Sequence, residues 1–181
     1  MRMRTKLFST KLFSSKNLVL FGFAFIMSMF VYGCGEDKKP NDTNILVGQF
    51  TWSVWQQQAG WSDYSASDYN PATVTTDSIT KLMQNKDVSF ILFGSSWCPD
   101  CMDEMPKFMK LCTLIGFEQD EVIIYGLDRS KAEPTGTHLR YNIQRVPTLI
   151  ILVDNEEIGR IVEFPTQGLG WEGDLLNFLS R

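Results

Sequence analysis

The feature that most constrains this chain is a pair of cysteines placed between two regular elements. Residues 88–93 form a short apolar run that is typical of a buried strand, and Cys98 and Cys101 follow it after four residues. Residues 98–115 then carry apolar side chains at helical spacing. A strand that leads into a C-x-x-C sequence and then into a helix favours an α/β fold with a redox-active cysteine pair.

The position of this cysteine pair at the start of a helix affects the ionisation of its thiols. Unpaired backbone N–H groups and the helix dipole favour a thiolate over a thiol at that position. We therefore expect Cys98 to attack a substrate disulfide and Cys101, one turn further on, to resolve the mixed disulfide. The negative charge of Asp100 opposes the thiolate, which predicts a reducing rather than an oxidising pair.

A zinc site and a purely structural disulfide are the alternatives for these two cysteines. Structural zinc usually needs four Cys or His ligands, and beyond residue 34 the remaining candidates are Cys112 and His138. We expect no metal and no cofactor other than the redox-active Cys98–Cys101 disulfide. Cys112 falls on the apolar side of the predicted helix, so a core role is favoured over a redox role, and His138 is expected to be an exposed helix residue.

Residues 1–33 have the composition of a secretory signal. Residues 1–16 are basic and contain no acidic residue, and residues 18–33 form an uncharged, mostly apolar run. The run ends at Gly33-Cys34, which resembles the lipobox of bacterial lipoproteins, and this resemblance implies lipidation of Cys34. Cleavage elsewhere and retention as a transmembrane helix are the alternatives, although the run is near the short limit for a span.

The remaining chain is expected to consist of a flexible polar tether over residues 34–48 and one domain over residues 49–181. Export places that domain where disulfides persist. We expect a lipid-anchored monomer in the bacterial cell envelope that faces the periplasm or the exterior. Loss of the basic signal makes the chain more acidic than its full-length formal charge of −4, which argues against a nucleic-acid partner.

Periodicity predicts the other elements. They are a strand near 49–55, a loop through 71, a helix that begins at Thr76 or Asp77, a strand at 121–127, a short helix from Thr137 to Tyr141, strands at 148–153 and 157–163 joined by a turn, and a helix at 170–180. This order predicts an α/β domain whose central mixed β-sheet is flanked by helices on both faces. Trp52, Trp55 and Trp61 are expected in the core, with a sugar- or peptide-binding patch as the alternative.

Residues 77–180 resemble the thioredoxin superfamily. The resemblance is carried by the sequence WCPDC at 97–101 and by YNIQRVPT at 141–148. It implies a thioredoxin fold in which Pro147 is a cis-proline and Val146 presents its backbone to a bound substrate strand. By the same resemblance, Trp97 and Pro99 border the substrate.

Within that superfamily, CPDCMDEMP at 98–106 is similar to membrane-tethered thiol reductases of cytochrome c maturation. That similarity points to Glu104, three residues after Cys101, as the residue that handles the proton. Thioredoxin has a buried aspartate and a lysine at positions that correspond here to Leu92 and Ile124, which leaves Glu104 as the nearest candidate. A solvated helix residue is the alternative reading of Glu104.

The expected function is thiol–disulfide exchange on exported proteins, as a reductant or an electron relay. The expected partners are protein thiols or disulfides and an upstream electron donor. The alternatives are a disulfide oxidase or isomerase, and a non-enzymatic lipoprotein that uses the fold as a binding module.

Overall fold

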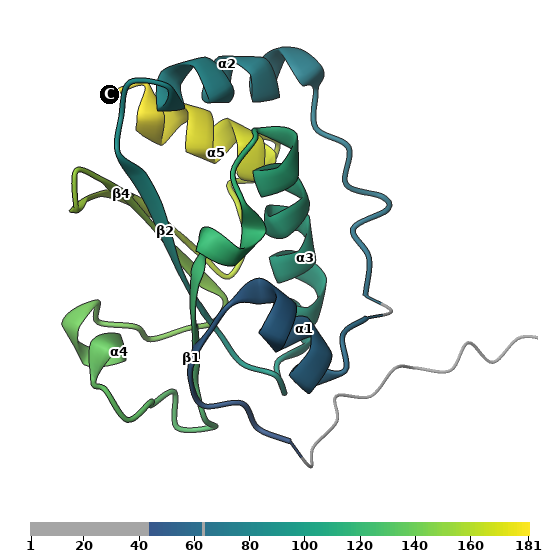
Figure 1. Cartoon of the computed structure of the whole chain (residues 1–181), viewed down its shortest axis with the longest axis vertical. Helices are drawn as coiled ribbons and strands as arrows, with labels where there is room; N and C mark the ends of the chain where they lie inside the picture. The colour runs from purple at the N-terminus through teal and green to yellow at the C-terminus, as the bar shows by residue number, and fades with distance from the viewer. Residues whose placement is uncertain (1–43, 63) are drawn as a thin grey trace, which may run out of the picture. The chain divides into compact units, whose positions relative to one another are not determined.

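The computed structural model describes residues 44–62 and 64–181. Cys34, the predicted signal and most of the predicted tether lie outside the described residues. The elements are β1 (Gly48–Phe50), α1 (Trp52–Ala59), α2 (Thr73–Met83), β2 (Val88–Gly94), α3 (Pro99–Leu114), the 3-10 helix η1 (Gln119–Glu121), β3 (Ile123–Gly126), α4 (Thr137–Arg140), β4 (Thr148–Val153), β5 (Glu156–Val162) and α5 (Gly170–Leu179) (Figure 1).

The strands of the described residues form one mixed sheet in the order β1-β3-β2-β4-β5. β2 and β3 run parallel, and every other neighbouring pair is antiparallel. The β4–β5 hairpin turns at Asp154 and Asn155, which both adopt positive φ angles, as asparagine and aspartate do more readily than most residues. The predicted mixed sheet is confirmed.

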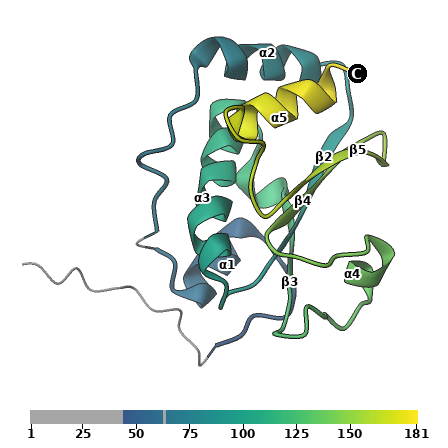
Figure 2. The ribbon, with the colours of Figure 1, turned by 180° about the vertical axis from the view of Figure 1, so that it is seen from behind.

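Helices cover both faces of this sheet. α1, α3 and α5 lie on one side, α2 packs against α5, and the short α4 lies on the opposite side (Figures 1 and 2). The alternation of β2 side chains matches this arrangement. Phe90 packs edge-on against Phe108 of α3, with ring centroids 5.3 Å apart, whereas Phe93 reaches Tyr141 beside α4, at 5.8 Å. The predicted α/β architecture with helices on both faces is therefore confirmed.

The middle of the sheet is apolar at the two positions where thioredoxin carries ionisable residues. Leu92 of β2 is the direct partner of Ile124 in β3 and of Leu149 in β4, and all three side chains are fully buried. A single charge in this row would have to be buried without a partner, which is costly. The three residues thus form a continuous hydrophobic strip in the core.

The predicted strand near 49–55 is wrong beyond Phe50. β1 ends there, and Trp52–Ala59 forms α1 instead. Trp52, Trp55 and Ala59 are buried and recur at helical spacing, so a helix rather than a strand buries all three together. Trp61 is also buried, which confirms the core role predicted for the three tryptophans.

Two boundaries also differ from the predictions. α2 begins at Thr73, directly after Pro71-Ala72, and Thr76 and Asp77 lie inside it, because the Thr75 and Thr76 N–H groups already bond to the Ala72 carbonyl. The predicted tether runs too far, because Leu46 is buried in the core and β1 starts at Gly48. Among the described residues, no helix has the length and apolarity needed to cross a bilayer.

Candidate active site

The two cysteines lie at the start of α3, at the end of β2. Cys98 is the N-cap residue, and its sulfur accepts a hydrogen bond from the Cys101 backbone N–H, with Sγ and N 3.4 Å apart. Pro99 occupies the first helical position, where its missing N–H removes no helical bond. The cysteines of the described residues, which include Cys112, are free thiols.

The pKa of the Cys98 thiol is lowered to about 7. A hydrogen bond from the Cys101 side chain has the largest effect, and the Cys101 N–H adds to it. Burial and the negative charge of Asp100 act in the opposite direction. Cys98 can therefore exist in large part as a thiolate near neutral pH, and the thiolate is the nucleophilic form of cysteine.

Cys101 has the opposite character. Its side chain is fully buried, and burial raises the pKa of its thiol well above the usual value, followed by the effects of the neighbouring Cys98 sulfur. The Ser95 N–H donates to the Cys101 sulfur at 3.4 Å. Near neutral pH, Cys101 therefore keeps its proton, whereas a large part of Cys98 is deprotonated. This asymmetry matches the predicted roles of an attacking and a resolving cysteine.

A cis peptide bond faces the nucleophile. The Val146–Pro147 bond is cis, which confirms the expectation for Pro147. In its thiol form, the Cys98 S–H group donates to the Val146 carbonyl oxygen, with sulfur and oxygen 3.6 Å apart. On its other side the segment is fixed to the sheet, because the Glu163 N–H donates to the Pro147 carbonyl at 2.7 Å. Val146 and Pro147 thus lie beside the reactive sulfur, where the resemblance placed them.

Trp97 is held against the loop that follows β3. Its indole Nε1–H donates to the Leu127 carbonyl at 3.3 Å, and the same carbonyl accepts from the Ser95 hydroxyl at 2.9 Å. The guanidinium carbon of Arg129 lies 5.1 Å from the centroid of the Trp97 ring, within range of a cation–π contact. Trp97 therefore has a defined position next to Cys98.

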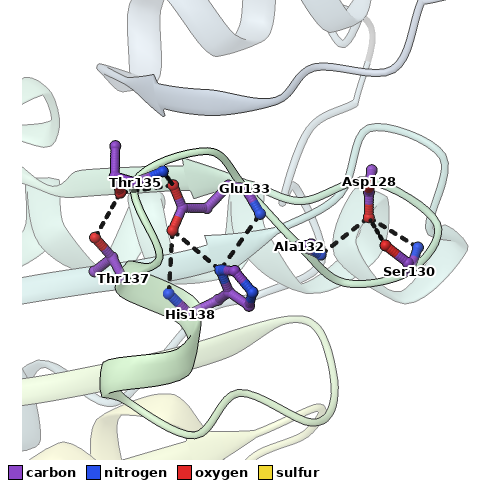
Figure 3. Close-up of polar contacts among 7 residues, drawn as sticks. All are labelled: Asp128, Ser130, Ala132, Glu133, Thr135, Thr137 and His138. Atoms are coloured by element: carbon purple, nitrogen blue, oxygen red, sulfur yellow. Dashed lines mark hydrogen bonds and ion pairs between the residues drawn. The ribbon is translucent and has the colours of Figure 1, made fainter.

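Two carboxylates organise the loop between β3 and α4 (Figure 3). Asp128 accepts hydrogen bonds from Ser130 and from the Ala132 N–H at 2.6–2.9 Å. Glu133 has a buried side chain that accepts from the Thr135 N–H and hydroxyl, both at 2.6 Å, and from the His138 N–H at 3.2 Å. These bonds fix the loop that carries Arg129 toward the active site.

His138 and Glu133 correct one prediction. The His138 ring nitrogen Nδ1 lies 3.1 Å from the Glu133 carboxylate, and only 12% of the His138 side chain is exposed. The expectation of an exposed histidine is therefore wrong, because the Glu133 carboxylate lies at the start of α4 and contacts both the ring and the backbone N–H of His138. Burial acts to raise the pKa of Glu133, but the hydrogen bonds from Thr135 and His138 outweigh it and lower that pKa to about 2.

Glu104 lies one turn after Cys101 on α3 and is buried, so it is not a solvated helix residue. One carboxylate oxygen accepts from the Trp171 indole N–H at 2.8 Å, and the other accepts from the Lys107 ammonium at 2.8 Å. The carboxylate therefore links α3 to α5. These two bonds hold a buried carboxylate on the turn of α3 that follows Cys101.

Cys112 is fully buried, as the core prediction requires, and burial raises the pKa of its thiol far above the usual value. Within the described residues, no cluster of three or more His, Cys, Asp or Glu side chains could hold a metal ion.

Sequence reasoning missed three groups at the site: Ser95, Ser96 and the loop carboxylates Asp128 and Glu133. Asp128-x-Ser130 directly after a strand is a turn signal that could have been found, because aspartate and serine side chains cap nearby backbone N–H groups. Glu133 likewise bonds to the nearby Thr135 and His138. The Ser95 and Ser96 hydroxyls bond to residues far away in the chain, and local pattern carries no information about those partners.

Comparison with known proteins adds the family and the fold. The family model described as Thioredoxin matches residues 70–169. No curated protein matches the chain. Among solved structures, a protein of unknown function from Pseudomonas aeruginosa is similar in fold, with a TM-score of 0.53, 15% identity, and coverage of 74% of this chain and 93% of that one.

Two thioredoxins are also similar. A single-residue variant of thioredoxin from Halobacterium salinarum has 22% identity and a TM-score of 0.33, with coverage of 56% of this chain and 80% of its own. A thioredoxin from Arabidopsis thaliana in the oxidised state has 21% identity and a TM-score of 0.33, with coverage of 50% and 76%.

Proposed function

The chain belongs to the thioredoxin family, and we propose that it reduces disulfides of exported proteins through Cys98 and Cys101. The family supports thiol–disulfide exchange in general. The observation that carries the specific proposal is the placement of the two sulfurs. Cys98 is held at the helix start by the Cys101 N–H and lies beside the Val146 carbonyl, whereas Cys101 is buried behind it.

The first step forms a mixed disulfide. The Cys98 thiolate attacks one sulfur of the substrate disulfide, a Cys98–substrate bond forms, and the substrate S–S bond breaks. The other substrate sulfur leaves as a thiolate and takes a proton from solvent. The Val146 backbone beside Cys98 can pair with the extended substrate strand and hold its disulfide in line with the attacking sulfur.

The second step releases the substrate. Cys101 gives up its proton, its sulfur attacks the Cys98 sulfur, and the bond between Cys98 and the substrate breaks. The substrate leaves with both sulfurs reduced, and the protein is left with a Cys98–Cys101 disulfide. A thiol donor of the cell envelope then supplies two electrons to restore the pair.

Cys101 needs a proton acceptor in the second step, and we assign this role to Glu104. The carboxylate is buried one helical turn from Cys101 and is the nearest ionisable group that the resemblance identifies. The Trp171 and Lys107 contacts hold it in place while leaving lone pairs for a proton.

We infer the direction of exchange from the charge of Asp100. Its charge raises the pKa of Cys98 relative to what the helix start alone would give. A less stabilised thiolate makes a pair more reducing. We therefore favour reduction over disulfide formation. We further propose that a lipid on Cys34 keeps the domain in the bacterial envelope.

Insulin reduction and trapping test this proposal together. The wild-type protein is expected to accelerate dithiothreitol-driven insulin reduction, Cys98→Ser to abolish it, and Cys101→Ser to accumulate mixed disulfides on Cys98 that mass spectrometry can map. Cys112→Ser is the matched control and is expected to keep full activity. Adducts on Cys101, or activity that survives Cys98→Ser, would overturn the assignment of the two cysteines. A reduction potential of the Cys98–Cys101 pair at the oxidising end of the family's range would favour an oxidase.

A further inference from the structure

The active-site loop is fixed to the segment that precedes β1. The Ser96 hydroxyl, two residues before Cys98, donates to the Asn44 carbonyl at 2.9 Å and accepts from the Leu46 N–H at 3.1 Å. Ser96 is 3% exposed, and Leu46 is buried as well. One buried oxygen atom therefore bridges two backbone groups that lie about 50 residues away in the chain.

A second observation fixes the same segment independently. A Cβ atom on Gly126 at the end of β3 would lie within 2.4 Å of the Leu46 carbonyl oxygen, which is closer than real Cβ contacts. The bare Gly126 backbone therefore lets the segment pass close to the ends of β2 and β3. These strand ends are also where the active-site loop begins.

Ser95 and Trp97, the neighbours of Ser96 in the active-site loop, are fixed by other hydrogen bonds. Ser95 is fixed by its hydroxyl bond to Leu127, and its carbonyl accepts from the Cys98 N–H at 3.1 Å. Trp97 is fixed by its own bond to Leu127. Ser96 lies between these two fixed residues, and its hydroxyl links the loop to Asn44 and Leu46 in the segment that precedes β1.

We propose that Ser96 is a positioning residue for the thiol exchange, and that the segment 44–46 is part of the active-site framework. This inference rests on the proposed function of Cys98. The bridge holds the loop so that the Cys98 sulfur stays in reach of the Cys101 N–H, and this hydrogen bond favours the thiolate. Loss of the bridge lets the loop move and weakens that bond.

The test is the pH profile of Cys98 alkylation by iodoacetamide, read on the Cys98 peptide by mass spectrometry. Ser96→Ala is expected to raise the midpoint of the profile by about one pH unit, which lowers the alkylation rate at pH 6 roughly tenfold, because only the thiolate reacts. Ser96→Thr keeps a hydroxyl and is expected to restore most of the wild-type profile. Gly126→Ala, which displaces Leu46, is expected to shift the midpoint in the same direction as Ser96→Ala.

Thr80→Val is the matched control. The Thr80 hydroxyl also bridges distant backbone, at 3.1 Å from the Ile115 carbonyl, but at the far end of α3. This variant is expected to lower the unfolding temperature without moving the Cys98 profile. If Ser96→Ala and Gly126→Ala lower the unfolding temperature and leave the profile unchanged, Ser96 is structural only and the proposal is wrong. Insulin reduction by the wild type, measured in parallel, separates that result from failure of the proposed function.

Discussion

The Glu104 carboxylate and the Trp171 indole N–H form a buried hydrogen bond of 2.8 Å between α3 and α5. Substitutions at its two ends separate proton transfer from positioning. Glu104→Gln keeps an acceptor for Trp171 but cannot take a proton, so we expect it to slow resolution of the mixed disulfide roughly tenfold or more. Trp171→Phe keeps the carboxylate and is expected to leave resolution nearly unchanged.

The measurement is stopped-flow Trp97 fluorescence on both half-reactions, across pH. The attack by Cys98 is expected to remain fast in both variants. Equal slowing by Glu104→Gln and Trp171→Phe would show that Glu104 only holds α3 against α5, and wild-type kinetics in Glu104→Gln would remove it from the mechanism.

The reactivity of Cys98 should follow its lowered pKa. The rate of alkylation is expected to rise with pH and to reach half its maximum near pH 7, because the thiolate forms as pH passes the pKa of about 7. Cys101 and Cys112 are expected to stay unmodified at this pH, since burial raises the pKa of both thiols. A midpoint above pH 8.5 would contradict the stabilising effect of the Cys101 contacts.

Asp100→Asn tests the electrostatic argument for a reducing pair. Removal of the carboxylate takes away an effect that raises the pKa of Cys98, so that pKa should fall below about 7. The reduced form is then more stable, and the reduction potential should move toward the oxidising end. Equilibration with glutathione measures the shift, and Asp103→Asn, exposed one turn further on, is the control. A potential that becomes more reducing in Asp100→Asn would refute this reasoning.

Glu133→Gln should destabilise the loop beside the active site. An amide has one oxygen, so it can satisfy either the Thr135 donors or the His138 N–H but not both. These donors are only partly buried, so the loss is expected at the low end of the cost of an unsatisfied buried donor, about 1 kcal/mol. Urea unfolding measures the loss. Glu156→Gln, on the exposed β4–β5 hairpin, is the control and should be neutral; equal stability of the two variants would contradict the loop assignment.

The same carboxylate predicts a response to acid. The pKa of Glu133 is depressed from 4.5 to about 2, so its contribution to stability is complete above pH 4.5 and is lost as pH falls toward 2. The unfolding free energy of the wild type should therefore decline over this range, and the decline should be smaller in Glu133→Gln. Parallel curves for the two proteins would show that Glu133 titrates normally.

Lipid attachment is predicted at Cys34. The intact protein from cells should carry diacylglycerol and acyl chains on that residue, and Cys34→Ala should release it from the membrane fraction, because several chains are needed for stable anchoring. Intact-mass analysis that finds an unmodified N-terminus, or a retained 1–33 segment, would exclude the lipoprotein assignment.

Local pattern was enough to predict the centre of the fold. The apolar run of β2, the cysteine spacing and the helical spacing of α3 each occur within a few residues, and the structure keeps all three in place. The strand predicted near 49–55 and the loop predicted after it both overlap α1. A helix places Trp52 and Trp55 on the same side, where both are buried. Their burial depends on packing against the rest of the fold, which is a tertiary effect.

Two of the missed site contacts join residues that lie far apart in the chain. Ser96 and Leu46 are 50 residues apart, and Glu104 and Trp171 are 67 residues apart. Hydrophobic periodicity predicts which apolar side chains share a face, but it does not predict which polar groups will form hydrogen bonds with each other. His138 was misjudged for another reason: its partner Glu133 is only five residues away, but the burial of the ring depends on the conformation of the loop between them.

If Cys34 carries a lipid, the bridge from Ser96 to Asn44 also limits how far the Cys98 sulfur can lie from the membrane. Nine residues lie between Cys34 and Asn44, and the ten Cα-to-Cα steps that join the two span at most about 35 Å when fully extended. With a lipid on Cys34, Cys98 would stay within a limited distance of the bilayer surface. A disulfide held in that layer by its own anchor would meet Cys98 at an effective concentration in the millimolar range, whereas a freely diffusing substrate would gain nothing from the tether.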